Sequence, residues 1–243
     1  MSRPRISRLK TWEQHERRVL EVLEKALLLL STKINLLPSE VELNRQLYFC
    51  LLEANSQLLA QRRGFEHPPI SEAKNPPHWD DEHHTLRENK IPDFLWGYID
   101  QTELDSRRQA KHFIIECKRL GNPTRKDWIL NQNYVNYGVL RFIQAGHAYA
   151  ISEKSAAMVG YVESMDFDDI LGQINDAGAL VSLPVLAPPL NGWTSQGLSR
   201  LEHTLDRSFL NSSLSLRHFW IDIRGCYTTT ISTKLETANK SPQ

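Results

Sequence analysis

Cysteine is scarce in this chain of 243 residues, and the three that it has, Cys50, Cys117 and Cys226, lie far apart. Their odd number argues against a disulfide framework, and the lack of paired spacing argues against a thiolate zinc site. A reducing compartment fits this pattern best.

Long apolar stretches are also lacking. The most apolar run, residues 26–30, is flanked by charged residues and is far shorter than the roughly 20 residues of a membrane-spanning helix. Residues 1–10 are basic but contain no apolar signal core. We therefore expect a cytoplasmic protein that has no membrane partner.

An excess of either charge is the third absence, because 29 Lys and Arg residues balance 29 Asp and Glu residues. No overall basic field attracts polyanions, so any contact with nucleic acid must come from a local patch. The length suffices for one sizeable core, and no internal repeat is apparent. We expect one domain, residues 1–243, with a core at about 38–165, an N-terminal helical annex at 1–37, a C-terminal extension at 166–226 and a loose tail at 227–243.

Apolar periodicity predicts a helix over residues 11–34 and a second helix with Ser39 as its N-cap. The apolar stripe of the second helix places Glu40 on the core-facing side, within about 60° of Leu43, whereas Glu42 faces water. A carboxylate in a first helical turn is common because it complements the helix dipole. Glu40 therefore either has that role alone or borders a functional site.

An apolar run at residues 113–115 is typical of a strand buried on both faces, and Glu116, Cys117 and Lys118 follow it directly. Side chains alternate along a strand, so Glu116 and Lys118 share one face while Cys117 points to the other. A buried strand usually avoids ending in paired charges unless the charges have a role. We therefore treat Glu116 and Lys118 as functional candidates.

A second strand-like run, residues 94–99, begins directly after Asp93. If the two runs form an antiparallel hairpin whose midpoint falls between Leu104 and Asp105, the residue opposite Asp93 is Glu116. This register gathers two carboxylates and one ammonium group at the same end of the hairpin.

The helix expected next, residues 124–144, is capped by Thr124 and has an apolar stripe that includes Trp128 and Gln132. A buried amide needs hydrogen-bond partners, so Gln132 either bonds to the backbone or reaches a polar site near the start of the helix. The later patterns predict a hairpin of residues 147–151 and 158–162, helices at 166–173 and 198–209, and strands at 180–185 and 214–223.

Two carboxylates at a sheet edge form a hard-oxygen site that suits Mg²⁺ or Mn²⁺. A neighbouring lysine can orient a water molecule, help it lose a proton or stabilise a developing oxyanion. Together these groups suit phosphodiester hydrolysis, in which water attacks a group that already carries negative charge and the leaving alkoxide must be neutralised. Cys117 is a poor candidate nucleophile because its thiol points away from the carboxylates.

At these residues the chain resembles the PD-(D/E)xK nuclease superfamily, whose fold is called restriction-endonuclease-like. The match consists of Pro92-Asp93 and Glu116-Cys117-Lys118, with an apolar strand before Glu116 and a capped helix after Lys118. The resemblance implies an α/β fold whose αβββαβ core, a mixed central sheet flanked by helices, covers roughly residues 40–151. An N-terminal helix and a C-terminal helix and strand would extend this core.

The resemblance also implies roles for individual residues. Asp93 and Glu116 would ligate the divalent metal with help from the backbone carbonyl of Cys117, and Lys118 would position the attacking water. The other catalytic positions that the family implies are Glu40 on the first core helix and Gln132 on the helix after the lysine.

We therefore expect a Mg²⁺-dependent nuclease, more an endonuclease than an exonuclease, that acts on DNA in restriction, repair or defence against foreign DNA. Its expected partners are nucleic acid and, because double-strand cutting commonly needs two active sites, a second copy of the chain or a partner protein. Two alternatives remain open. One is a catalytically silent module of the same fold that holds nucleic acid or scaffolds a partner, and the other is a small-molecule hydrolase that uses the same acids.

Overall fold

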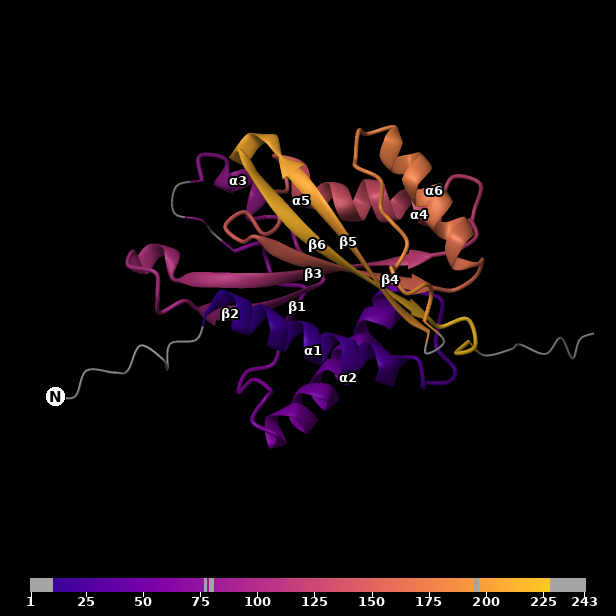
Figure 1. The fold of residues 1–243 in the computed structure, drawn as a ribbon, viewed down its shortest axis with the longest axis horizontal. Coiled ribbons are helices and arrows are strands. Elements are labelled where there is room, and N and C mark those ends of the chain that lie inside the picture. Colours follow the sequence, from indigo (N-terminus) through magenta and orange to yellow (C-terminus); the bar gives the residue numbers. More distant parts are fainter. Residues whose placement is uncertain (1–10, 77, 79–80, 195–196, 228–243) are drawn as a thin grey trace, which may run out of the picture.

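The computed structural model describes residues 11–76, 78, 81–194 and 197–227. These residues form an α/β structure with a six-stranded mixed sheet in the order β1-β2-β3-β4-β6-β5, and helices cover both of its faces (Figure 1). Within these ranges no helix is both long and apolar enough to cross a lipid bilayer. The strands are β1 (Ile70–Ser71), β2 (Phe94–Ile99), β3 (Ala110–Leu120), β4 (Ser155–Val162), β5 (Leu198–Arg207) and β6 (Ser212–Asp222). The helices are α1 (Trp12–Leu30), α2 (Glu40–Ala60), α3 (His84–Arg87), α4 (Leu130–Tyr134), α5 (Leu140–Ile143) and α6 (Phe167–Ala179).

Helices α1 and α2 pack against each other and cover the lower face of the sheet in Figure 1. Thr11 starts α1 with a capping box, because its hydroxyl accepts a hydrogen bond from the Gln14 backbone and the Gln14 side chain accepts one from the Thr11 backbone. Ser39 precedes α2 as expected, although its side chain makes no cap hydrogen bond. The buried stripes of both helices contact the same sheet residues, which include Phe113, Ile115 and Cys117.

Strands β2 and β3 form the antiparallel hairpin that the sequence predicts. Phe94 pairs with Ile115, and continuing this register by one residue sets Asp93 opposite Glu116, as expected. Ile115 and Cys117 join the core under α1 and α2, so alternation places Glu116 on the opposite face of the sheet. The predicted register is therefore confirmed.

Strand β4 lies inside the sheet, parallel to β3 on one side and to β6 on the other. The chain reaches it from β3 by a crossover that contains α4, the π-helical turn η3 (Val135–Val139) and α5. All residues of β4 are buried, as expected for a parallel strand covered on both faces. The pairing of β3 with β4 holds the end of β3 that carries Glu116 and Lys118 in the middle of the sheet.

The helix that the sequence places at residues 124–144 begins only at Leu130. Residues 122–128 instead form an exposed turn, in which the Thr124 backbone N–H donates to the Trp128 carbonyl at 3.2 Å. Thr124 is therefore not the helix cap. Trp128 lies outside the helix and is exposed, so it does not belong to the buried stripe.

The helix expected at residues 198–209 is also wrong, because this segment forms the edge strand β5, which pairs antiparallel with β6. Leu201, His203 and Leu205 are buried and alternate with exposed residues. Leucines spaced three and four apart suit a helix, but the segment also alternates with period two. Backbone hydrogen bonding to β6 selects the strand.

Three smaller expectations have different outcomes. The hairpin of residues 147–151 and 158–162 is wrong, because residues 147–151 lie in turns and β4 pairs with β3 and β6 instead. The strand expected at 180–185 is irregular. The helix near 166–173 and the last strand are confirmed as α6 and β6.

Candidate active site

Asp93 lies where β2 and β3 part, one residue before β2 begins. Two hydrogen bonds fix its carboxylate: Oδ2 accepts from the backbone N–H of Cys117 at 2.6 Å, and Oδ1 accepts from Nδ2 of Asn44 on α2 at 2.9 Å. Tyr161 on β4 in turn donates its hydroxyl to Oδ1 of Asn44 at 2.9 Å. The position of Asp93 therefore depends on α2, β3 and β4 together.

Glu116 on β3 is fully buried, and cations hold one of its carboxylate oxygens. Its Oε1 atom accepts a hydrogen bond from Nη1 of Arg141 at 2.6 Å and lies 2.9 Å from Nζ of Lys118. Its Oε2 atom is buried and has no hydrogen-bond partner among the described residues. Buried polar atoms normally have a partner, so Oε2 is the atom through which Glu116 can accept a further ligand.

The Lys118 ammonium group is nearly buried and donates to oxygens from two elements. Its Nζ atom lies 2.7 Å from Oε1 of Glu40, in the first turn of α2, and 2.8 Å from the backbone carbonyl of Cys117. With the contact to Glu116, Lys118 links the end of β3 to the start of α2. The expected residues thus meet in one carboxylate cluster, which consists of Asp93, Glu116, Lys118 and Glu40 together with Arg141.

Burial sets the protonation of the two inner carboxyl groups. It raises the pKa of Glu116 to about 8, and the charge of Asp93 adds to this rise while Lys118 and Arg141 oppose it. Burial also raises the pKa of Asp93 to about 6, against Lys118 and the Cys117 N–H. For Lys118, burial alone would lower the pKa, but the negative charges of Glu116, Asp93 and Glu40 outweigh it and the pKa is raised. Lys118 is therefore protonated at neutral pH.

Close packing over Lys118 depends on Gly138 in η3. A Cβ atom at this position would lie 2.5 Å from Cε of Met158, which is too short for two carbon atoms, and 3.3 Å from Cγ of Lys118, which is a tight contact. The absence of a side chain at Gly138 thus allows the helical crossover to cover the Lys118 stem.

Gln132 does not join the carboxylate cluster, and the prediction that it is buried is wrong. Its side chain is exposed on α4, and its neighbour Asn131 is the buried amide instead. Asn131 accepts a hydrogen bond from the Gly121 N–H at 2.9 Å and donates to the side chain of Gln173 on α6 at 2.9 Å. A buried amide does follow Lys118 in the sequence, but it holds the loop and α6 rather than the cluster.

Two residues of the site were missed from the sequence. Asn44 lies one helical turn after Glu40 on α2, and this i, i+4 spacing is a signal that could have identified it. Arg141 had no such signal, because its helix is interrupted by η3 and its contact with Glu116 joins residues far apart in the sequence. The sequence therefore predicts Asp93, Glu116 and Lys118 but not Arg141, the second cation that binds Glu116.

The acidic residues of the cluster and the Cys117 carbonyl offer hard oxygen atoms as possible ligands. Within the described ranges, no group of three or more His, Cys, Asp and Glu side chains is arranged to hold a metal ion. However, Mg²⁺ is usually bound by one or two carboxylates and keeps several waters. The Oε2 atom has no partner among the described residues, and the Asp93 carboxylate and the Cys117 carbonyl already accept hydrogen bonds but each keeps a further lone pair, so these oxygens match the ligand type that Mg²⁺ prefers.

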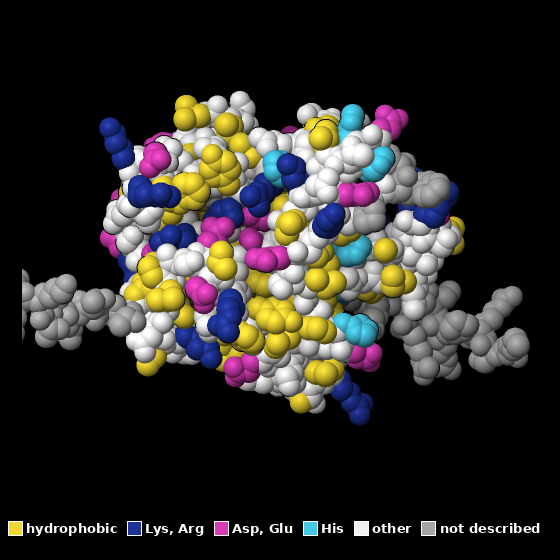
Figure 2. Space-filling model, turned by 180° about the vertical axis from the view of Figure 1, so that it is seen from behind, with side chains coloured by type: hydrophobic (Ala, Val, Ile, Leu, Met, Phe, Trp, Pro, Cys, Tyr) yellow, Lys and Arg dark blue, Asp and Glu magenta, His cyan; other side chains and the backbone are white. Residues whose placement is uncertain are grey.

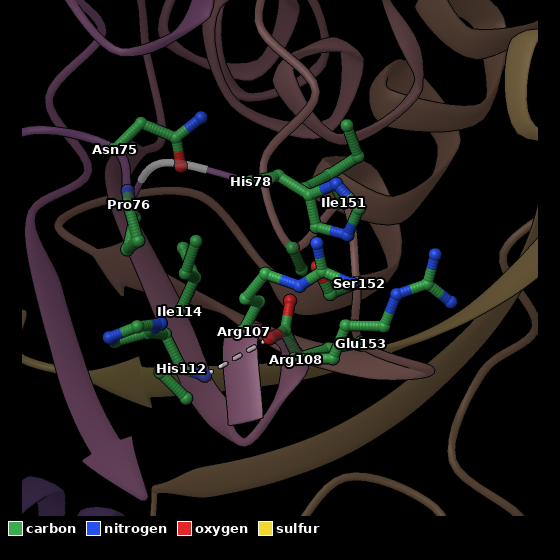
Figure 3. Close-up of a pocket in the computed structure, with 12 residues that line it drawn as sticks. Asn75, Pro76, His78, Arg107, Arg108, His112, Ile114, Ile151, Ser152 and Glu153 are labelled. Carbon is green, nitrogen blue, oxygen red and sulfur yellow. Dashed lines mark hydrogen bonds between the residues drawn. The ribbon is translucent and has the colours of Figure 1, made fainter. Parts of the chain in front are cut away.

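Figure 2 shows a hollow on the rear face of the molecule in which dark blue and magenta side chains lie together. Figure 3 shows a pocket that is lined by residues that include His112 and Ile114 of β3, Glu153, Arg107 and Arg108. There, Oε1 of Glu153 accepts a hydrogen bond from the His112 backbone N–H at 3.0 Å. This pocket contains no residue of the carboxylate cluster.

Comparison with known proteins adds nothing to this geometry. No protein-family model, no curated protein and no solved structure matches the chain. The function proposed for the cluster therefore rests on its own contacts and charges.

Proposed function

We propose that this chain is a metal-dependent phosphodiester hydrolase, a nuclease of the PD-(D/E)xK superfamily with the restriction-endonuclease-like fold. Its proposed substrate is nucleic acid, with DNA favoured, and its proposed cofactor is Mg²⁺ or Mn²⁺. We favour an endonuclease of restriction, repair or defence. The observation that carries the proposal is the buried Glu116 carboxylate, which keeps one unpartnered oxygen in a cluster with Asp93 and Lys118.

The order of the elements supports this proposal. Helix α2, strands β1, β2 and β3, the helical crossover and β4 occur in the order αβββαβ over residues 40–162, with the short helix α3 inserted between β1 and β2. In that order β2 and β3 are antiparallel while β3 and β4 are parallel. The carboxylate cluster lies where β2 and β3 part, next to the first turn of α2.

Lys118 would act as an oriented cation and not as the general base. Its contacts with Glu116, Glu40 and the Cys117 carbonyl fix the direction of the ammonium group, and the same negative charges keep it protonated. These three oxygens match the three N–H donors of the ammonium group, so Lys118 would act through its charge, which can stabilise negative charge on a phosphate oxygen. Because Lys118 retains its proton at neutral pH, another group must accept the proton of the attacking water.

Asp93, Glu116 and the backbone carbonyl of Cys117 would hold the divalent metal. When bound, such an ion lowers the pKa of water and neutralises the leaving oxygen. Arg141 would remain on Oε1 of Glu116 and fix the orientation of the carboxylate, so that Oε2 points to the ligand.

The test is cleavage of supercoiled plasmid and of labelled oligonucleotides in the presence of Mg²⁺ or Mn²⁺, and again with EDTA. We expect cleavage that EDTA abolishes, and a loss of about a hundredfold or more in Glu116→Gln and Lys118→Ala. Glu153→Gln is the matched control and should keep its activity, because it replaces another buried glutamate that lies outside the cluster. Calorimetric titration with Mn²⁺ gives a second readout that needs no turnover, and Glu116→Gln should weaken binding.

A second candidate function is a catalytically silent module of the same fold that binds nucleic acid or scaffolds a partner. It is favoured by the pairing of Glu116 with both Lys118 and Arg141, which already neutralises the carboxylate without a metal. Tight DNA binding without metal-dependent cleavage would favour this candidate over the nuclease. Turnover of a generic phosphodiester without affinity for nucleic acid would instead indicate a small-molecule hydrolase.

A further inference from the structure

Two exposed aromatic side chains stack on each other near the carboxylate cluster. Trp128, in the turn after β3, is 42% exposed, and Tyr137, in η3, is 54% exposed. Their ring centroids are 6.4 Å apart and their planes differ by 16°. Aromatic side chains supply most of their energy when they are covered, so this exposed pair is suited to contact a planar ligand.

The chain connects this aromatic pair directly to the carboxylate cluster. Tyr137 precedes Gly138, which packs against the stem of Lys118. Arg141, which binds Glu116, lies four residues after Tyr137 on the same helical crossover. A strand whose phosphate lies at Glu116 and Lys118 could therefore place neighbouring bases on Tyr137.

Positive charge accompanies the aromatic rings. The guanidinium group of Arg125 lies 5.7 Å from the Trp128 ring centroid, and Lys126 beside it is exposed. Asp127 offsets part of this charge, so the turn carries a net positive charge of one. The turn is also held in shape, because the Trp128 N–H donates to the Arg125 carbonyl at 3.0 Å and the Thr124 N–H donates to the Trp128 carbonyl.

We propose that Trp128 and Tyr137 form a stacking platform for unpaired bases, and that Arg125 and Lys126 contact the phosphates of the same strand. The inference rests on the proposed function and names its substrate class, which is single-stranded or locally unpaired nucleic acid. Aromatic side chains stack on the faces of bases, and these faces are free in a single strand but covered by neighbouring pairs in a duplex. A fixed aromatic pair beside a basic turn is the combination that single-strand binding needs.

Binding without cleavage tests the platform. In EDTA, fluorescence anisotropy compares a labelled oligothymidylate of about 20 nucleotides with a hairpin duplex of the same length. We expect the wild type to prefer the single strand. Tyr137→Ala and Trp128→Ala should each weaken single-strand binding by roughly ten- to a hundredfold, because each removes one stacking surface, and should leave duplex binding nearly unchanged.

Two variants serve as controls. Tyr137→Phe keeps the ring and should retain the affinity of the wild type, which separates stacking from loss of the hydroxyl. Phe49→Ala removes an equally exposed ring on α2, which also has an arginine over it, Arg45 at 5.1 Å. Phe49 lies about 180° around the helix from Glu40, so this variant should bind like the wild type.

A third measurement tests the phosphate contacts. When the logarithm of the binding constant is plotted against the logarithm of the salt concentration, Arg125→Ala should make the slope less steep by about one, which corresponds to the loss of one phosphate contact.

The results separate this inference from the proposed nuclease function. Unchanged single-strand affinity in both alanine variants, an equal loss on the duplex, or no nucleic-acid binding by the wild type would overturn the platform. If Glu116→Gln abolishes cleavage while the alanine variants bind normally, the nuclease stands and the platform fails. If the alanine variants lose single-strand affinity but no metal supports cleavage, the platform stands and the nuclease fails.

Discussion

Glu116 shows how strongly single contacts shape the site. Its carboxylate is fully buried, which raises its pKa, and two cations hold one of its oxygens while the other has no partner among the described residues. A fully buried carboxylate is rare unless it is paired or ligates a metal. Lys118 and Arg141 thus offset only part of the cost of burying Glu116, and one oxygen stays available for a ligand.

The Arg141 contact can be tested through stability. Arg141→Ala should lower the free energy of unfolding by about 1.5–3 kcal/mol, because it removes a hydrogen bond between a charged group and a buried carboxyl. Arg200→Ala is the matched control, since Arg200 pairs with Glu24 on the surface and should contribute about 1 kcal/mol or less. Urea unfolding at neutral pH measures both variants. Equal losses would show that burial does not strengthen the contact of Arg141.

The raised pKa of Glu153 leads us to expect that the stability of the folded protein depends on pH. Burial raises its pKa from the ordinary 4.5 to about 7, while the His112 N–H and Lys111 oppose the rise. The folded state therefore favours the protonated form, so the stability that this group contributes is complete below about pH 4.5 and is lost as the pH rises to about 7.

Glu153→Gln removes this titration and keeps an acceptor for His112. The variant should gain stability relative to the wild type between about pH 4.5 and 7, by at most about 3 kcal/mol. Urea unfolding at about pH 4.5 and pH 8 measures the difference between the two proteins. A difference that does not change with pH would contradict the raised pKa.

At the scale of elements, the β2–β3 hairpin and the helical crossover contribute differently to the site. The hairpin register follows from strand alternation and one midpoint, so Asp93 and Glu116 could be placed opposite each other from the sequence. The crossover could not be placed, because Thr124 lies in a turn and the π-helical η3 interrupts the helix. Such π-helical turns are often found at functional sites.

The substitution Gly138→Ala tests whether the helical crossover must lie in close contact with β3. Gly138→Ala would press a methyl group onto Met158 and Lys118, so we expect a loss of about 1–3 kcal/mol in the free energy of unfolding. Under the proposed function, cleavage should fall as well, because the Lys118 stem must move. Chemical denaturation and the plasmid assay measure the two effects.

Gly172→Ala on α6 is the matched control for Gly138→Ala. A Cβ atom at Gly172 would meet no other described atom within 4 Å, apart from its own helix and chain neighbours, so alanine should stabilise the helix by about 0.5–1 kcal/mol. Opposite signs for the two glycines would show that close packing decides the effect. A stabilised Gly138→Ala would contradict the packing over Lys118.

At the scale of the whole molecule, the sheet joins the segments that precede and follow the proposed core. Strand β6 lies between β4 and β5, and α1 packs on residues of β5 and β6 that include Leu198, Phe219 and Ile221. The buried strand β4 therefore depends on β6 for its second row of backbone hydrogen bonds.

Truncation tests this dependence. A chain that ends at residue 165 lacks α6, β5 and β6, and it leaves β4 as an exposed apolar edge, which favours aggregation. We expect this chain to be insoluble or to unfold without cooperativity, as measured by near-ultraviolet circular dichroism and urea titration. A chain that ends at residue 227 keeps every described element and is the control. Cooperative unfolding of the shorter chain would show that residues 1–165 fold independently.

The sequence alone determined the features that depend on local periodicity. Helical spacing located α1 and α2 and placed Glu40 on the correct side, and strand alternation with a hairpin midpoint paired Asp93 with Glu116. The tertiary structure decided which distant elements meet. Asn44 reaches Asp93 across 49 residues and Arg141 reaches Glu116 across 25, and backbone pairing with β6 made residues 198–207 a strand. Local patterns do not show which distant residue or strand is the partner in such contacts, because the contacts depend on how packed elements face one another.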